Sequence, residues 1–183
     1  MNSNNIKQIV EAADLLHRTL RKLVVSGQGI HAETIIAAAA RMAGTMLFRS
    51  FSPTFDHLPP GTVVLSDLGN EQGPVLLSTM FATLKQLGHD DIDEQRLGGA
   101  TDTTAQSQLS LSETQTILEP WYRKTMEVCR LSFRDTAAAA AMATALQIHD
   151  CRSVLQVHSG CAIAIHGMVE SLKTVPQPLA AAS

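Results

Sequence analysis

The sequence contains few charged and few aromatic residues. Of its 183 residues, 17% are charged and 4% are aromatic, and the formal net charge is −3. Lysine and arginine form no run anywhere along the chain. Proteins that bind nucleic acid need a concentrated positive patch to neutralise phosphates, and they commonly stack bases on aromatic rings. The composition therefore disfavours nucleic acid as a partner.

Cysteine is scarce, and long apolar runs are missing. The three cysteines, Cys129, Cys151 and Cys161, show no C-x-x-C spacing. An odd number without that spacing argues against a disulfide framework and favours the reducing cytoplasm as the location. The first residues lack the basic region and apolar run of a signal peptide. Because no stretch of 18 apolar residues is free of charge or histidine, we expect no membrane span.

The apolar residues that are present recur at helical spacing. They make up 45% of the chain, which is typical of a globular protein long enough to bury a core. Steps of three and four residues predict an all-α, single-domain bundle of five to seven helices over residues 1–175. The tail at 176–183, which is rich in proline and alanine, is expected to fray. The predicted helices cover 5–25, 32–51, 74–87, 112–133 with a kink at Pro120, 136–149 and 152–173.

Several residues mark where these helices begin and end. Pro74 suits the first position of its helix, and Gly88 suits the position just past its end. Ser112 and Gln115 have the spacing of a capping box, in which two side chains bond each other's backbone N–H groups. Asp135 is expected to cap the alanine-rich helix that follows it. Residues 52–73, which contain three prolines, are predicted to be irregular.

The helix at 152–173 is predicted to be central, because it has two apolar faces of different kinds. One face is bulky and the opposite face carries only small residues. The bulky face consists of Val154, Leu155, His158, Cys161, Ile165, Val169 and Leu172. The helix at 32–51 repeats this design. We therefore expect the two helices to cross closely on their thin faces, with Ala37, Ala40 and Gly44 against Gly160, Ala164 and Gly167. The alternative is that one thin face meets the alanine-rich helix at 136–149.

The first helix carries a heptad pattern that could serve either of two purposes. Ile6, Ile9, Leu16 and Leu20 belong to a seam whose apolar residues alternate in steps of three and four. Such a seam either packs inside one bundle or joins two chains in a coiled coil. Three heptads are marginal for a coiled coil without other contacts. Together with the low charge content, the seam favours a homo-oligomer.

The C-terminal third holds the residues best suited to bind a ligand, namely His149, His158, Cys161 and His166. One straight helix cannot direct four ligands at a tetrahedral metal ion, and the spacing fits no zinc motif. We therefore predict no metal site and interpret His158 as a buried, neutral histidine. The three cysteines fall in or beside apolar helical positions, which favours structural roles over reactive ones.

Two functions remain compatible with these patterns. The favoured one is a helical protein that acts by self-assembly or by binding other proteins. The alternative is a bundle with an internal small-molecule or metal site, with or without catalytic activity, near His158, Cys161 and His166 and the irregular segment 52–73. The G-x-S-x-G, H-E-x-x-H and Walker motifs are missing. The sequence therefore names neither a cofactor nor a reaction.

Overall fold

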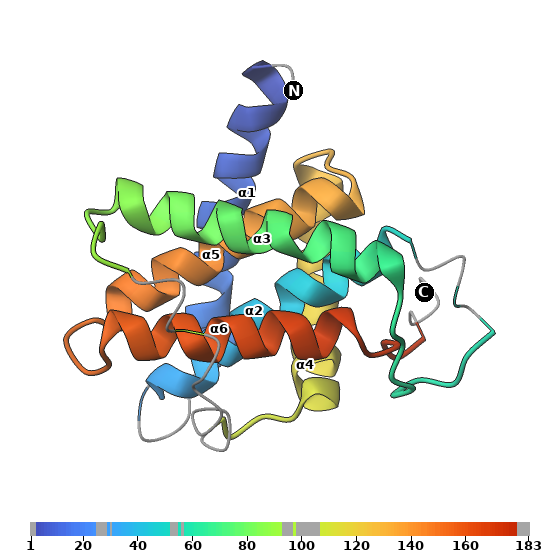
Figure 1. The fold of residues 1–183 in the computed structure, drawn as a ribbon. Coiled ribbons are helices and arrows are strands. Elements are labelled where there is room, and N and C mark those ends of the chain that lie inside the picture. The colour runs from blue at the N-terminus through green and yellow to red at the C-terminus, as the bar shows by residue number, and fades with distance from the viewer. Residues whose placement is uncertain are drawn as a thin grey trace.

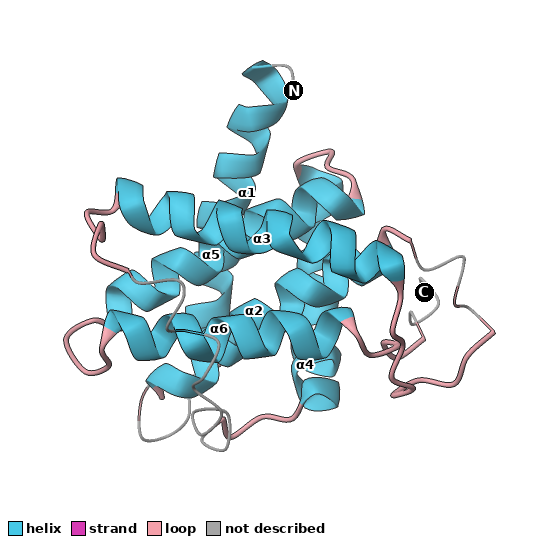
Figure 2. Cartoon of the chain, viewed as in Figure 1, coloured by secondary structure: helices cyan, strands magenta, loops and turns pink. Residues whose placement is uncertain are grey.

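The computed structural model describes residues 3–24, 29, 31–51, 55, 57–92, 97 and 107–178. Within these residues the chain forms six α-helices joined by loops (Figures 1 and 2), which confirms the all-α prediction. α1, α2 and α5 begin and end within about three residues of their predicted bounds. The helices are α1 (Ser3–Leu23), α2 (Ala32–Arg49), α3 (Asp67–Gln86), α4 (Leu111–Val128), α5 (Phe133–Cys151) and α6 (Val157–Leu172).

α2 lies at the centre of the bundle. It packs most extensively against α6 and α5, and it also contacts α3, α4 and α1. In Figure 1, α3 and α6 run across the front of the molecule, whereas α1 and α4 run steeply behind them. Every residue from Thr34 to Phe48 is buried. Its four consecutive alanines, Ala37–Ala40, favour a helix and leave room for neighbours on all sides.

The predicted close crossing of α2 and α6 is confirmed. A Cβ atom built on Gly167 would lie 3.1 Å from both the carbonyl oxygen of Ala37 and the Cβ of Ala40. One built on Gly44 would lie 2.5 Å from the carbonyl oxygen of Met168. The two backbones therefore touch where each helix has a glycine. Gly160 faces side chains instead, those of Ile148 on α5 and Ile36 on α2.

The bulky face predicted for α6 is covered only in part: Cys161 and Leu172 are buried, whereas other residues of this face are exposed. α6 begins at Val157, five residues later than predicted, and residues 152–155 form turns. Val154 is 78% exposed, and both His158 and Val169 are exposed. The interpretation of His158 as a buried histidine is therefore wrong. The thin face of α6 is the side that packs against α2, because small residues let the backbones approach closely.

α3 begins seven residues earlier than predicted. The Ser66 side chain caps the helix by accepting a hydrogen bond from the N–H of Gly69, and Pro74 lies inside the helix. Gly69 and Gly73 pack against the side chain of Leu172 on α6. This tertiary contact offsets the cost of an internal proline. The segment predicted to be irregular, 52–73, is thus helical over its last seven residues.

The end of α3 agrees with the prediction at Gly88. Gly88 has a φ of 89°, and its N–H donates to the carbonyl of Lys85. The N–H of the next residue, His89, donates to the carbonyl of Leu84 at 3.0 Å. These two bonds form a Schellman motif, which satisfies the last carbonyls of a helix. The motif fixes the position of His89.

The same motif ends α4 earlier than its predicted limit at residue 133. Arg130 takes the left-handed conformation with a φ of 54°, and the N–H of Leu131 donates to the carbonyl of Met126. Because arginine rarely takes this conformation, the residue type at this position does not indicate that the helix ends there. The chain then turns at once into α5, which begins with Phe133.

The capping boxes lie elsewhere than expected. Ser110 and Glu113 form the box that begins α4, so the predicted pair Ser112 and Gln115 is wrong. Gln115 is instead buried and donates a hydrogen bond to the Thr45 hydroxyl on α2. Asp135 does help to begin α5, but as the partner of Ser132, which occupies the capping position.

The segment after α6 is tied back to the bundle as far as Gln177. Val64 N–H donates to the carbonyl of Lys173 at 2.7 Å, and Val175 N–H donates to that of Thr62 at 2.9 Å. Arg49 donates to the carbonyl of Gln177. Residues 179–183 of the predicted frayed tail lie outside the described residues. Among the helices described, none is long and apolar enough to cross a membrane.

We expect Gly44→Ala to destabilise the fold. Helix propensity alone favours alanine by about 1 kcal/mol, but the added methyl group would overlap the backbone of α6. Overpacking of this kind costs on the order of 1–3 kcal/mol or more. Urea denaturation gives the free energy of unfolding. Gly160→Ala is the matched control, because its methyl group meets side chains that can move; equal stabilities of the two variants would contradict the close crossing.

Candidate functional site

The four residues predicted to bind a ligand do not form one site. His158 and His166 are exposed on α6, eight residues and thus about 12 Å apart along its axis. Cys161 is fully buried, and His149 is half-buried near the end of α5. Among the described residues, no three histidine, cysteine, aspartate or glutamate side chains converge as metal ligands.

His149 has a partner that the sequence analysis missed. His89 Nε2 lies 2.9 Å from His149 Nδ1, and the two rings meet edge to face with centroids 5.1 Å apart. Burial lowers the pKa of His149, and Arg152 and His89 lower it further. The two rings are therefore joined by a hydrogen bond, and the lowered pKa favours the neutral form of His149. The two residues lie 60 positions apart, so no local pattern could reveal the contact.

The cysteines have the environments of structural residues. Burial raises the pKa of Cys161 to about 12. Burial is also the main reason that the pKa values of Cys129 and Cys151 lie above their usual range. A raised pKa keeps a thiol protonated, and a protonated thiol is a poor nucleophile. These environments favour the structural interpretation.

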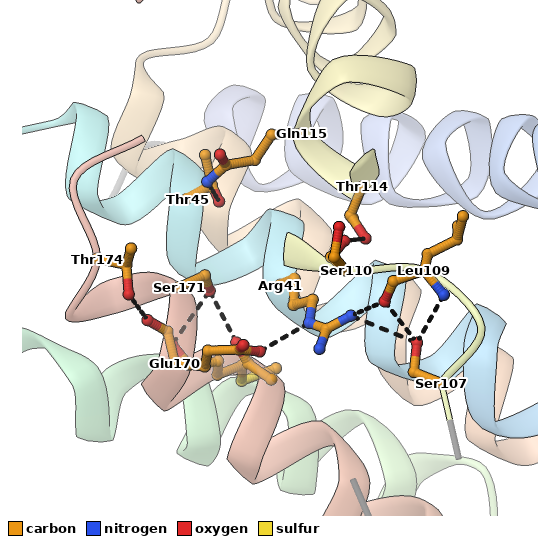
Figure 3. Close-up of polar contacts among 12 residues, drawn as sticks. Arg41, Thr45, Ser107, Leu109, Ser110, Thr114, Gln115, Glu170, Ser171 and Thr174 are labelled. Carbon is orange, nitrogen blue, oxygen red and sulfur yellow. Dashed lines mark hydrogen bonds and ion pairs between the residues drawn. The ribbon is translucent and has the colours of Figure 1, made fainter. Parts of the chain in front are cut away.

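Two buried arginines on α2 hold non-helical segments in place. Arg41 binds Glu170 on α6 at 2.8 Å and also donates to the Ser107 hydroxyl and the Leu109 carbonyl (Figure 3). The Thr34 hydroxyl accepts from the N–H of Gln108 beside them. The segment that leads into α4 is thereby fastened along α2. Because these groups satisfy one another, we assign the network a structural role.

The second arginine, Arg49, forms a two-pronged ion pair with Glu119 on α4. Arg49 Nε lies 2.7 Å and Nη2 3.1 Å from the two carboxylate oxygens, and both side chains are less than 10% exposed. The paired geometry matches the planar guanidinium to the carboxylate and gives strong hydrogen bonds. The same guanidinium holds Gln177. This contact joins α2, α4 and the C-terminal segment.

An apolar groove lies between α1, α3 and α5. We call it the α1 groove, and its volume is about 610 Å³. Three of its apolar side chains are about half exposed: Ile6 by 50%, Val10 by 48% and Val75 by 49%. In Figure 1 the end of α1 that bears the N-terminus projects beyond the other helices. The helix thus presents apolar side chains where its own chain covers them incompletely.

The predicted interface residues of α1 separate into two groups. Ile9, Leu16 and Leu20 are buried inside the chain, whereas Ile6 is exposed in the α1 groove. Most of the heptad seam therefore packs within the bundle. Val10, which neighbours the seam in sequence, joins Ile6 in the groove. Val75 comes from α3 and could not be assigned to this surface from its own local pattern.

A second groove runs between α3 and α6. We call it the α3–α6 groove; its volume is about 630 Å³. Its floor is apolar, whereas its end near the C-terminus of α3 carries Lys85, His89 and Asp90. Neither His158 nor His166 is part of its lining. Its apolar lining residues are Pro74, Leu77, Phe81, Ala82, Ile92 and Ile165.

Comparison of the chain with protein-family models, curated proteins and solved structures found no match. The function must therefore be argued from the surfaces, charges and contacts described above.

We expect Arg49→Met to destabilise the protein more than Arg41→Met. Loss of Arg49 leaves Glu119 buried without its cation, which typically costs about 3–5 kcal/mol. Glu170, the partner of Arg41, is 32% exposed and can be hydrated when its partner is removed. Denaturation in urea compares the two variants, each of which keeps an aliphatic stem. An equal decrease in the free energy of unfolding for the two variants would show that the burial of the partner carboxylate does not determine the loss of stability.

We expect Cys161 to resist thiol reagents in the folded protein. Its pKa of about 12 leaves almost no thiolate near neutral pH, and the side chain is fully buried. Reaction with a disulfide reagent, followed by mass spectrometry of peptides, measures the labelling of each cysteine. Denaturant should make all three equally reactive. Rapid labelling of Cys161 without denaturant would contradict the structural role.

Proposed function

We propose that the protein functions by association with other protein chains, and first with a second copy of itself, through the α1 groove. The supporting observation is the cluster of half-exposed apolar side chains on the projecting part of α1 and the adjoining face of α3. Exposed apolar surface of this kind is typical of interaction sites. The low charge content of the whole chain agrees with this interpretation.

A two-fold arrangement suits the charges of this surface. A two-fold interface must be complementary to itself, so it needs groups of both signs. The groove is bordered by Arg134 and Asp135, and the exposed side of α1 carries Lys7 and Glu11. A partner of strongly single-signed charge would meet repulsion at one of these residues. A second copy can place opposite charges against each other.

The gain available at these three residues is modest. Full burial of a valine or isoleucine side chain contributes about 1.5–3 kcal/mol, so completing the burial of Ile6, Val10 and Val75 adds roughly 1 kcal/mol each. In a two-fold dimer the same three residues of both subunits are buried, so their free-energy contribution is doubled. Because association costs at least about 4 kcal/mol in lost freedom and a micromolar complex needs a net gain of about 8 kcal/mol, we expect further contacts along the groove to contribute to a reversible complex.

A second candidate function is binding of a small molecule in the α3–α6 groove. The specific observation is an apolar floor with Lys85, His89 and Asp90 at one end. This arrangement suits an apolar molecule with a polar group at one end. It replaces the predicted site at His158 and His166, neither of which lies in the groove. Native mass spectrometry of the purified chain detects a retained ligand and the number of subunits together.

We expect Val10→Glu to shift the protein toward monomer. A glutamate at this position would place a negative charge in the apolar contact. Because the dimer is two-fold symmetric, the interface would contain one such charge from each subunit. Because Val10 is about half exposed in the single chain, folding of the monomer should be little affected. Sedimentation velocity over a range of concentrations measures the change in the association constant, which we expect to fall at least tenfold.

Val154→Glu is the matched control, since this valine is exposed on a loop and belongs to neither groove. It should sediment like the parent chain. A parent chain that stays monomeric at every concentration would reject self-association. If Val10→Glu and Val154→Glu changed the association constant equally, the dimer interface could not be assigned to the α1 groove.

A further inference from the structure

The His89–His149 pair lies where two helices end. His89 follows the Schellman motif of α3, and His149 belongs to the last turn of α5. The C-terminal end of a helix carries a partial negative charge, because its last carbonyl groups point outward. Such an end favours a cation nearby, and Arg152 already donates to the carbonyl of His149 at the end of α5. Neither proposed binding groove accounts for the pairing.

The distance between the two ring nitrogens has the value expected of neighbouring metal ligands. Imidazole nitrogens bind first-row metal ions at about 2.0–2.1 Å. Two such ligands at a right angle lie about 2.9 Å apart, whereas a tetrahedral angle separates them by about 3.3 Å or more. The observed separation of 2.9 Å between His89 Nε2 and His149 Nδ1 matches the right angle. Square-planar or tetragonal nitrogen sites are typical of Cu²⁺ and Ni²⁺.

We propose that His89 and His149 chelate a divalent cation of tetragonal preference, Cu²⁺ or Ni²⁺. The cation takes the place of the proton that the two rings share. The ring that donates this proton shifts to its other tautomer: Nδ1 of His89 or Nε2 of His149 then carries the hydrogen. Both rings stay neutral, and the two nitrogens each give a lone pair to the cation.

The surroundings leave room for the remaining ligands. His89 lines the open α3–α6 groove and His149 is half-buried, so water can complete the coordination. Four charged groups lie near the pair. Two are close to His149 in sequence, and two line the groove beside His89. Asp150 is already bound to His17 and Arg21, and Arg152 donates to the carbonyl of His149 at 2.7 Å. Lys85 and Asp90 in the groove have opposite charges.

Titration of the untagged full chain with Ni²⁺ tests this proposal. Isothermal calorimetry measures the affinity, and the shift in melting temperature measures the stabilisation that binding to the folded state confers. We expect His89→Gln and His149→Gln each to weaken binding at least tenfold. The matched control is a chain with both His158→Gln and His166→Gln, because these exposed histidines on α6 should leave the affinity unchanged.

Equal affinity of the parent, His89→Gln and His149→Gln chains would overturn the proposal, as would a loss of binding in the control. A further measurement on the unaltered chain guards against misfolded variants. Bound Cu²⁺ is paramagnetic in square-planar and tetragonal sites alike and should broaden the imidazole proton resonances of His89 and His149. Failure of these resonances to broaden, or broadening of exposed histidines such as His158 instead, would place the cation elsewhere and refute the chelate.

Discussion

The close approach of the α2 and α6 backbones is the constraint on which the rest of the structure depends. Gly44 and Gly167 lie at this contact, where a larger residue would overlap the facing helix. Once α6 lies against α2, the stem of Arg41 passes beside Gly167 and its guanidinium reaches Glu170, less than one turn farther along α6. The small residues thus set both the packing and the position of the main polar network.

Polar contacts fix the segments of the chain that the packing of the helices does not hold in place. Arg41 and Thr34 fasten the segment before α4, whereas Arg49 fastens α4 and the segment after α6. Both arginines belong to the most buried helix, where an unpaired charge would be costly. Their partners come from parts of the chain 66 or more residues away. Packing and ion pairing therefore select the same arrangement.

The core is rich in alanine and also buries many larger apolar residues. Several further large apolar residues remain exposed at the surface. On α1 and α4 these are Ile6, Val10, Leu15, Ile117, Trp121 and Val128. The α1 groove gathers two of them beside Val75 of α3. Burial of such surface by a second chain is the physical basis of the proposed self-association, and the His89–His149 pair stands apart from it.

The sequence by itself determined the all-α fold, most helix positions and the small-residue contact of α2 with α6, because helical periodicity and glycine placement are local properties of the chain. It did not determine where α3 and α6 begin, since Pro74 is tolerated through packing against Leu172 and Val154 faces solvent instead of a neighbour. The exposure of His158 was misjudged for the same reason. A helical pattern shows which residues share a face, but only tertiary packing decides which face is covered. Contacts across 60 residues, as between His89 and His149, arise from the positions of whole helices and leave no local signal.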